Sequence, residues 1–512
     1  MCGILFVHQG PALPIDPARF RKALERQSWR GPDATGTAVH RDGQLLLGNN
    51  RLSIIDPLPH SNQPIRSGDG RYEIVFNGEI YNHVALREKF DLVCRHGSDT
   101  ETIVELFSRI GTDAFGHLDG MFALVIVDLQ TTKWWAVRDF AGIKPLYYSS
   151  TADAVVIASE PATVDALRPS SRDAAALDEL RLARRPVPGH SFFEGVKELL
   201  PGHVLTSDGD IYRFTGISVE PRDAFDQDRL AELLRRSVYT HEMSDVPVVS
   251  MLSGGIDSAL VAALSSVRET YCVGLPDNNE CDAARDTARE TGKNLNTVLT
   301  DADEMTETWR RLCRLRGEPL SVPNEGLIYL CCKAMKPSEK VVLTGEGADE
   351  LFFGYDGIFR WALDAAWPGA EAFLRRYGYS DTVPVGRRLS DYVEEMKAGK
   401  SVLDFVEDFF LHFHLPGLLR RMDFASMAAS REARVPFVSR DLVQYMYRRE
   451  AHLRLDPSES KIPLRRLCDN LGTRSTLERR KIGFSATPSS VSTRQEEYRR
   501  FYDLCLEAIE WS

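Results

Sequence analysis

The sequence predicts a two-domain protein, in which a strand-rich α/β or α+β domain precedes a domain with a doubly wound parallel sheet. The chain has 512 residues, which is too long for one hydrophobic core. Short β-branched and aromatic runs fill the first two hundred residues, whereas buried strands alternate with helical segments further on. A polar stretch with Gly, Pro and Asp, at about 201–226, separates the two patterns. We therefore expect domains at 1–210 and 226–512.

Composition and charge argue against several classes of protein. A net charge of −11 argues against a nucleic-acid partner, which usually requires a clustered basic surface. No run approaches the roughly 20 apolar residues that span a bilayer, and the N-terminus lacks the features of a signal peptide. The nine cysteines show no Cys-x-x-Cys or zinc spacing. We expect a reduced, cytoplasmic protein without nucleic-acid or membrane partners.

Individual elements follow from these patterns. In the first domain, strands are expected at 72–78, 122–129 and 133–139, and a helix at 100–110 that begins after Ser98, Asp99 and Thr100. In the second domain, buried strands are expected within 246–252, 270–275 and 340–343. A helix is expected at 258–267, and the chain is expected to be mainly helical from residue 390.

The segment Ser-Gly-Gly-Ile-Asp-Ser at 253–258 lies between a strand and a helix, where open α/β sheets bind ligands. Two glycines let backbone N–H groups approach an anion, and the helix N-terminus adds a favourable dipole. The Ser253 and Ser258 hydroxyls can donate to phosphate oxygens. Asp257 fits an anion site only with a cation, which suggests Mg²⁺. The alternative is an ordinary strand–turn–helix, but the segment is similar to the pyrophosphate loop of ATP pyrophosphatases.

A second loop, Thr-Gly-Glu-Gly-Ala-Asp-Glu at 344–350, also follows a buried strand. Three acidic residues at the edge of a sheet repel one another unless a metal or a basic group compensates them. A solvated turn is the alternative, but beside the first loop the sequence favours a metal site.

Cys2 becomes the N-terminal residue when Met1 is removed. Its free α-amine, with an ordinary pKa of about 7.7–8.0, is then a usable general base beside the thiol. Taken alone, a cysteine at this position is a weak signal.

Cys2 is followed in order by RGPD (30–33), NRLSIID (50–56), NGEIYN (77–82), GSDTE (97–101), LDGMFAL (118–124), SGGIDS (253–258), TGEGADE (344–350) and ARVPF (433–437). This order resembles the glutamine-hydrolysing asparagine synthetases almost from end to end. The resemblance implies an αββα N-terminal-nucleophile glutaminase sandwich, followed by an ATP pyrophosphatase domain with added helices. It also implies ATP and Mg²⁺ as cofactors, and glutamine and a carboxylate acceptor as substrates.

The resemblance assigns roles to residues of both domains. Cys2 is expected to be the nucleophile, with Asn77 and the Gly78 N–H as the oxyanion hole. The residues expected to bind glutamine are Arg51, through a bidentate guanidinium, Asn77, Gly78, Glu79 and Asp99, although Asp99 could also cap a helix. The residues expected to bind ATP are Met251, Leu252, Ser253, Gly254, Gly255, Asp257, Ser258, Val273, Thr344 and Gly345. Asp257 and Asp349 are the expected metal ligands. Glu346 and Lys481 are expected to be catalytic, and Lys461 is a second candidate for the lysine.

The family reaction adenylates a carboxylate with ATP, and ammonia from glutamine crosses an internal tunnel to attack the acyl-adenylate. Family members that act on aspartate usually carry Leu-Glu-x-Arg-x-Pro-Phe-Leu-Asp, where this chain has 431–439 ending in Ser439. Three hypotheses therefore remain: an asparagine synthetase, a relative that amidates another carboxylate (a uronic acid, a peptide or a biosynthetic intermediate), or a catalytically silent binding protein. A cluster around Glu346 and Arg434 sized for aspartate would favour the first, and an open cleft the second. A homodimer is compatible with the sequence, which does not indicate an oligomeric state.

Overall fold

A computed structural model describes residues 2–12, 14–218, 224–276, 280–378, 380, 382–477 and 494–511. The chain forms two compact units, which are considered separately. The first unit comprises Met1–Asp173, Pro188–Gly216 and Ser244–Val246, and the second comprises Ala174–Val187, Ile217–Met243 and Pro247–Ser512. The main change of unit lies close to the boundary expected at about 210–226, but Ala174–Val187 groups with the second unit.

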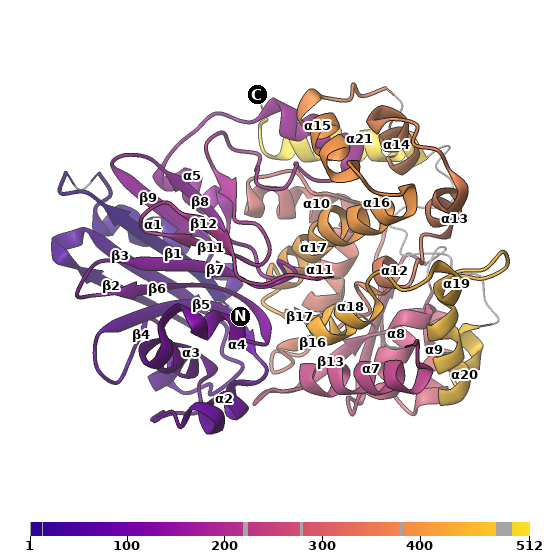
Figure 1. Ribbon diagram of the computed structural model, residues 1–512, viewed down its shortest axis with the longest axis horizontal. Helices are drawn as coiled ribbons and strands as arrows, with labels where there is room; N and C mark the ends of the chain where they lie inside the picture. Colours follow the sequence, from indigo (N-terminus) through magenta and orange to yellow (C-terminus); the bar gives the residue numbers. More distant parts are fainter. Residues whose placement is uncertain are drawn as a thin grey trace. The chain divides into compact units, whose positions relative to one another are not determined.

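The first unit contains two six-stranded sheets (Figure 1). The strands are β1 (Cys2–Gln9), β2 (Ala34–His40), β3 (Leu45–Arg51), β4 (Ile65–Arg66), β5 (Tyr72–Ile80), β6 (Gly120–Asp128), β7 (Trp134–Arg138), β8 (Tyr147–Ser150), β9 (Ala154–Ala158), β10 (Lys197–Glu198), β11 (His203–Thr206) and β12 (Ile211–Arg213). The first sheet has the order β10–β8–β9–β1–β3–β2 and the second β12–β11–β7–β6–β5–β4. Neighbouring strands in both sheets are antiparallel.

A hydrophobic core joins the facing sides of these sheets, with Ile4 and Phe6 from the first and Val75 and Val125 from the second. The outer face of the second sheet packs on α3 through Ile103 and neighbouring side chains. The helices of this unit are α1 (Pro17–Glu25), α2 (His83–Phe90), α3 (Asp99–Ile110), α4 (Ala114–His117) and α5 (Pro161–Leu167). Because α1 and α5 contact the first sheet, the layers are helix, sheet, sheet and helix. This arrangement confirms the predicted sandwich.

The register of the two sheets positions the N-terminal cysteine. In the first sheet, Cys2 is the cross-strand partner of Arg51. In the second sheet, Asn77 and Gly78 of β5 pair with Ala123 and Phe122 of β6. The strands expected at 72–78, 122–129 and 133–139 correspond to β5, β6 and β7, and the helix expected at 100–110 corresponds to α3.

The second unit is built on a five-stranded parallel sheet. Its strands are β13 (Val248–Met251), β14 (Glu269–Gly274), β15 (Asn294–Leu299), β16 (Val341–Leu343) and β17 (Glu432–Arg434). They lie in the order β15–β14–β13–β16–β17, and each pair is parallel. The order reverses between β13 and β16, so the loops that follow these two strands meet at the switch point of the sheet. Doubly wound sheets bind ligands at this point.

Helices cover this sheet and extend beyond it (Figure 1). They are α6 (Ala174–Ala183), α7 (Gln227–His241), α8 (Ile256–Leu264), α9 (Cys281–Thr291), α10 (Ala302–Arg316), α11 (Glu325–Lys333), α12 (Ala348–Leu351), α13 (Asp356–Asp364), α14 (Ala370–Tyr377), α15 (Arg387–Lys397), α16 (Val402–Phe409), α17 (Leu415–Met427), α18 (Arg440–Met446), α19 (Ala451–Arg454), α20 (Ile462–Leu471) and α21 (Arg494–Ala508). A π-helical turn, Phe410–His414, joins α16 to α17. An aromatic core that includes Phe373, Phe405 and Phe409 binds α14 to α16.

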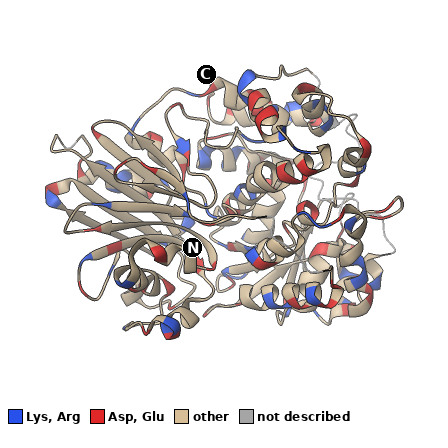
Figure 2. Ribbon diagram, viewed as in Figure 1, with Lys and Arg blue, Asp and Glu red and all other residues tan. Residues whose placement is uncertain are grey.

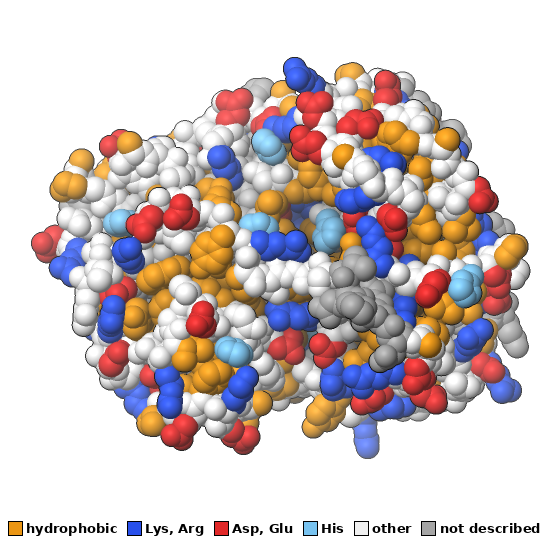
Figure 3. Space-filling model, viewed as in Figure 1, with side chains coloured by type: hydrophobic (Ala, Val, Ile, Leu, Met, Phe, Trp, Pro, Cys, Tyr) orange, Lys and Arg blue, Asp and Glu red, His pale blue; other side chains and the backbone are white. Residues whose placement is uncertain are grey.

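Charged side chains are more frequent on the helices of the second unit than on the central strands of the first (Figure 2). Basic and acidic side chains alternate over the face drawn in Figure 3. Within the described ranges, no helix is both long enough and apolar enough to cross a bilayer.

Candidate active sites

Cys2 opens strand β1, and its side chain is buried in the first unit. Its backbone nitrogen donates to Asn77 Oδ1 over 2.9 Å, and Gln63 Nε2 donates to Cys2 Sγ over 3.7 Å. The nitrogen that removal of Met1 would convert into an α-amine is therefore held by Asn77. Sequence reasoning did not identify Gln63, whose position follows no recognisable motif.

Asn77 uses only one end of its buried amide. Its oxygen accepts the Cys2 N–H bond, whereas Nδ2 is buried and has no hydrogen-bond partner among the described residues. An unsatisfied buried donor is costly unless a ligand satisfies it. Beside the thiol, such a donor can serve an oxyanion.

Gly78 follows Asn77 on β5 with a positive φ of 154°. A Cβ atom at this position would lie 2.1 Å from the carbonyl oxygen of Met121 on β6. The close approach of the two strands therefore requires glycine, and it fixes the backbone beside the Asn77 amide.

A buried ion pair supports the first residues of β1. Arg30, from the RGPD motif, donates through Nε to the Cys2 carbonyl over 3.1 Å and pairs with Glu160 over 2.6 Å. Both side chains are almost fully buried. This pair gives the RGPD motif a positioning role that the sequence did not reveal.

Asp99 is the first residue of α3 and is buried. Its carboxylate accepts the N–H groups of Ile80 over 3.0 Å and Thr100 over 2.8 Å. Burial raises the pKa of Asp99, against the opposing effects of His83 and of these two hydrogen bonds. A substrate ammonium would favour the ionised carboxylate. Glu79, another residue expected to bind glutamine, is 3% exposed on β5.

Arg51 makes four hydrogen bonds to its own loop. Its terminal nitrogens donate to the carbonyls of Ile55, Asp56 and Leu58 and to Asn62 Oδ1, over 2.7–3.1 Å. The guanidinium therefore organises the 55–62 loop. Bidentate binding of a substrate carboxylate requires some of these acceptors to be exchanged for the ligand.

The second unit contains a cavity of about 340 Å³ at the switch point of its sheet. Nine of the ten residues expected to bind ATP line it, together with Glu346 and Asp349; the nine are Met251, Leu252, Ser253, Gly255, Asp257, Ser258, Val273, Thr344 and Gly345. Gly254 is the exception. A Cβ atom there would lie 2.7 Å from the Cβ of Ala283, so this glycine allows the loop to approach α9.

The loop at 253–258, called the phosphate loop from here on, is held together by hydrogen bonds of its own serines. The Ser253 and Ser258 hydroxyls are 3.0 Å apart, and Gly255 N–H donates to Ser253 Oγ over 3.2 Å. These bonds can be exchanged for bonds to phosphate oxygens. Gly345 brings the second loop against the first, because a Cβ atom there would lie 2.9 Å from Ser258 N.

Lys461 joins the two carboxylates predicted to hold a metal. Its Nζ lies 2.7 Å from both oxygens of Asp257 and 2.5 Å from Asp349 Oδ1. The carboxylates thus converge on a cation beside the phosphate loop. Mg²⁺ is usually held by one or two carboxylates together with substrate phosphates, so the pair fits this ion. Within the described ranges, no group of three or more His, Cys, Asp and Glu side chains has the geometry of a metal site. Lys481 lies outside the described residues.

Glu346 pairs with Arg421 of α17 over 2.8 Å, and both side chains are largely buried. The other residue that the sequence placed near Glu346 is Arg434. Arg434 is fully buried and bonds to Glu432 and to the carbonyls of His241 and Met243 instead. Arg434 does not appear among the residues that line the cavity. It holds the end of α7 against β17.

A chain of titratable groups leads away from the same cavity. Tyr355 donates to Glu350 Oε1 over 2.6 Å and lies 3.1 Å from His414 Nε2, while Tyr377 contacts His414 Nδ1 over 2.5 Å. Burial, followed by the charges of Asp349 and Glu346, raises the pKa of Glu350 to about 8. Burial lowers the pKa of His414. Tyr355 and His414 line the cavity, so these hydrogen bonds connect it to the buried Glu350.

Comparisons with known proteins agree with the two units. A family described as "Asparagine synthase" matches residues 229–508, and a "Glutamine amidotransferase domain" matches residues 1–215. The chain is 29% identical to asparagine synthetase [glutamine-hydrolyzing] 1 of Bacillus subtilis, over 89% of this chain and 82% of that protein. It is also 29% identical to the putative asparagine synthetase of Mycobacterium tuberculosis H37Rv (94% and 87% covered). Amidase chyE of Penicillium rubens is 30% identical (75% and 66% covered).

The asparagine synthase match covers more than half of the 512 residues, and the amidotransferase match covers the unit that contains Cys2. These matches confirm the family predicted from the order of the motifs. The chain belongs to the asparagine synthase family and is a glutamine-hydrolysing carbon–nitrogen ligase.

Proposed function

We propose that this chain adenylates an acceptor carboxylate with ATP and aminates it with ammonia released from glutamine at Cys2. One observation carries the glutaminase half of the proposal. The Asn77 amide holds the Cys2 nitrogen with its oxygen and leaves its buried Nδ2 without a partner among the described residues. A nucleophile, its base and an oxyanion donor are thereby placed on two neighbouring residues in space.

In the glutaminase half, the α-amine of Cys2 takes the thiol proton as sulfur attacks the glutamine carboxamide carbon. Asn77 Nδ2 and Gly78 N–H receive the charge that develops on oxygen. The protonated amine delivers its proton to the departing ammonia, and water then hydrolyses the thioester to glutamate. Asp99 and Glu79 bind the substrate ammonium, and Arg51 binds its carboxylate.

In the synthetase half, the loop N–H groups and the hydroxyls of Ser253 and Ser258 bind the phosphates of ATP. Asp257 and Asp349 would hold Mg²⁺, whose charge would offset that of the phosphates. The acceptor carboxylate attacks the α-phosphate and pyrophosphate leaves. Ammonia attacks the acyl-adenylate and AMP leaves with the amide formed. Glu346 takes the proton that the attacking nitrogen loses, and Arg421, which pairs with Glu346 over 2.8 Å, orients its carboxylate.

Two acceptors are in question, aspartate and a different carboxylate. The burial of Arg434 away from the cavity removes the feature that would have favoured a pocket sized for aspartate around Glu346 and Arg434. ATP–pyrophosphate exchange and AMP release, measured with aspartate and other carboxylic acids, test the proposal. Aspartate-dependent AMP release with equal amounts of asparagine would establish aspartate as the acceptor. Exchange only with other acids would establish the second candidate.

The absence of both AMP release and glutamine hydrolysis would contradict the proposal as a whole. Removal of Met1 is a separate requirement, because a retained methionine blocks the α-amine. Mass spectrometry of the N-terminal peptide checks this requirement, and the expected peptide begins at Cys2.

A further inference from the structure

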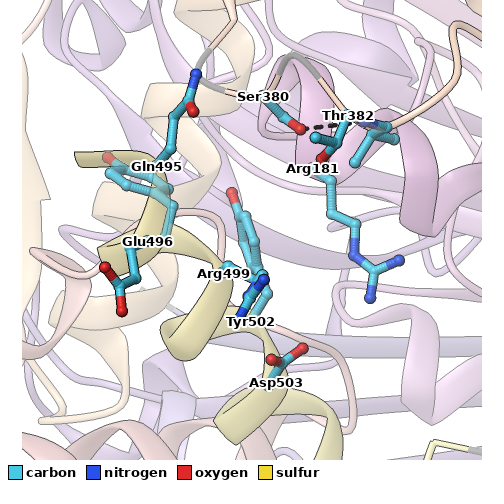
Figure 4. A pocket seen from close by; sticks show the side chains of 10 residues that line it. Arg181, Ser380, Thr382, Gln495, Glu496, Arg499, Tyr502 and Asp503 are labelled. Atoms are coloured by element: carbon cyan, nitrogen blue, oxygen red, sulfur yellow. Dashed lines mark hydrogen bonds between the residues drawn. The ribbon is translucent and has the colours of Figure 1, made fainter. Parts of the chain in front are cut away.

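A second cavity of about 530 Å³ lies in the second unit (Figure 4). One wall is α21, which contributes Glu496, Arg499 and Asp503, and another is Arg181 of α6. Thr382, between α14 and α15, also lines the cavity. Neither the glutaminase chemistry nor the phosphate loop uses these residues.

The wall formed by α21 is fixed to the rest of the unit. The buried Tyr502 donates its hydroxyl to the Ser321 carbonyl over 2.8 Å, and Phe501 packs edge-on against Trp309 of α10 at 5.2 Å between ring centroids. A wall held in this way is preorganised, which lowers the entropic cost of binding.

Tyr498 connects this cavity to the synthetase site. Its side chain lines both the 340 Å³ cavity at the phosphate loop and the 530 Å³ cavity against α21. The nucleotide-side cavity has a volume near the lower end of ligand sites, which span roughly 300–1,000 Å³. The loop at 253–258, which we expect to bind ATP, and the Glu346–Arg421 pair both line it, so a carboxylate beside Glu346 and Arg421 would share this cavity with the nucleotide. The body of an acceptor larger than aspartate then has space on the other side of Tyr498.

The lining of the second cavity indicates what kind of molecule it receives. The charges of Arg181 and Arg499 are balanced by those of Glu496 and Asp503, and Thr382 adds a hydroxyl. A polyanionic ligand would require an excess of positive charge. Donors, acceptors and both signs of charge together suit a zwitterionic chain with backbone amides. Arg181 has only a loose contact with Asp178, at 3.8 Å, whereas Glu496 also pairs with Arg500.

We propose that the acceptor is a peptide. Its reacting carboxylate lies beside Glu346 and Arg421, and its body passes Tyr498 into the cavity between Arg181 and Arg499. This inference rests on the proposed function and names the acceptor class for the same synthetase site.

The test is ATP–pyrophosphate exchange by the full chain with Mg²⁺, comparing aspartate with defined pools of aspartate- and glutamate-containing tetrapeptides. We expect exchange with peptides at lower concentration than with aspartate, and a peptide amide detectable by mass spectrometry when glutamine is added. Exchange supported by aspartate but not by any peptide pool would overturn the inference and leave the proposed function standing. No exchange with any carboxylate would contradict the proposed function itself.

The matched variants are the double change Arg181→Ala with Arg499→Ala, and Arg314→Ala as a control. The Arg314 side chain is 61% exposed on α10, and this residue lines neither cavity. Losing hydrogen bonds from two charged groups should raise the KM for the peptide about tenfold or more. The kcat, the KM for ATP and glutamine hydrolysis should stay within about twofold of wild type. An unchanged peptide KM in the folded double variant would overturn the inference.

Discussion

Replacing Asn77 by aspartate separates the two functions that we propose for its side-chain amide. The substitution keeps an oxygen that can accept the Cys2 N–H bond, which is 2.9 Å long. It removes the hydrogens of Nδ2, the buried group without a partner among the described residues. Losing one oxyanion donor typically lowers kcat about 10²- to 10³-fold, or about 3–4 kcal/mol of transition-state stabilisation. We expect a loss of this size in glutamate release, with a smaller effect on the KM for glutamine.

Steady-state glutaminase kinetics measures this loss, and ATP–pyrophosphate exchange should be unaffected. Asn82→Asp is a matched control. In wild type the Asn82 amide donates to the His117 carbonyl, and the substitution removes this donor too. Asn82, however, lies at the start of α2 rather than beside Cys2. Because Asn77 is fully buried, thermal unfolding must accompany the kinetics. A folded Asn77→Asp enzyme with kcat within threefold of wild type would refute the assignment of Nδ2 as the oxyanion donor.

Three further predictions concern the second unit. Gly345→Ala places a Cβ atom 2.8 Å from the Cβ of Asp257, so nucleotide titration should show ATP affinity falling at least about tenfold while glutamine hydrolysis persists; unchanged affinity would contradict the close contact of the two loops. Lys461→Met removes the ammonium that Asp257 and Asp349 share. It should lower the free energy of unfolding by about 3 kcal/mol in metal-free buffer. Adding Mg²⁺ should then raise the Tm of the variant more than that of wild type. Glu350 has its pKa raised from 4.5 to about 8, so the stability that its protonated form contributes is complete below about pH 4.5 and is lost as the pH rises through about 8. Glu350→Gln stays neutral, and its unfolding free energy, from urea titrations, should therefore fall less than that of wild type between about pH 5 and pH 9.

The sequence carried most of the information needed for the strands and the loops that follow them. Strand β5 and the strand that leads into the phosphate loop are short runs bounded by glycine or polar residues, and such runs carry a local signal. Gly345 was expected to bind ATP from the resemblance, and its loop directly follows the buried strand β16 and lines the cavity. In contrast, α6 joins the second unit through long-range packing, and Ala174–Val187 has no local feature that indicates it.

Several side chains of the candidate sites could not be predicted, because tertiary contacts bring them together. Tyr355 and His414 are 59 residues apart, and His414 reaches the cavity from a π-helical turn that no periodicity marks. Arg421 lies on α17 with no local sequence feature that marks it, and only the tertiary fold brings it against Glu346. Arg434 shows the opposite case. Its motif suggested a place beside Glu346 in the acceptor site, but its buried side chain donates to the carbonyls of His241 and Met243.

We propose that Cys2 releases ammonia from glutamine at one site and that a separate site uses this ammonia. Cys2→Ala tests this claim most directly, with AMP formation measured using glutamine or ammonium as the nitrogen source. The variant should release no glutamate and form no amide from glutamine, but keep wild-type AMP and amide formation with ammonium. Loss of both activities in a folded variant, or continued use of glutamine, would contradict it.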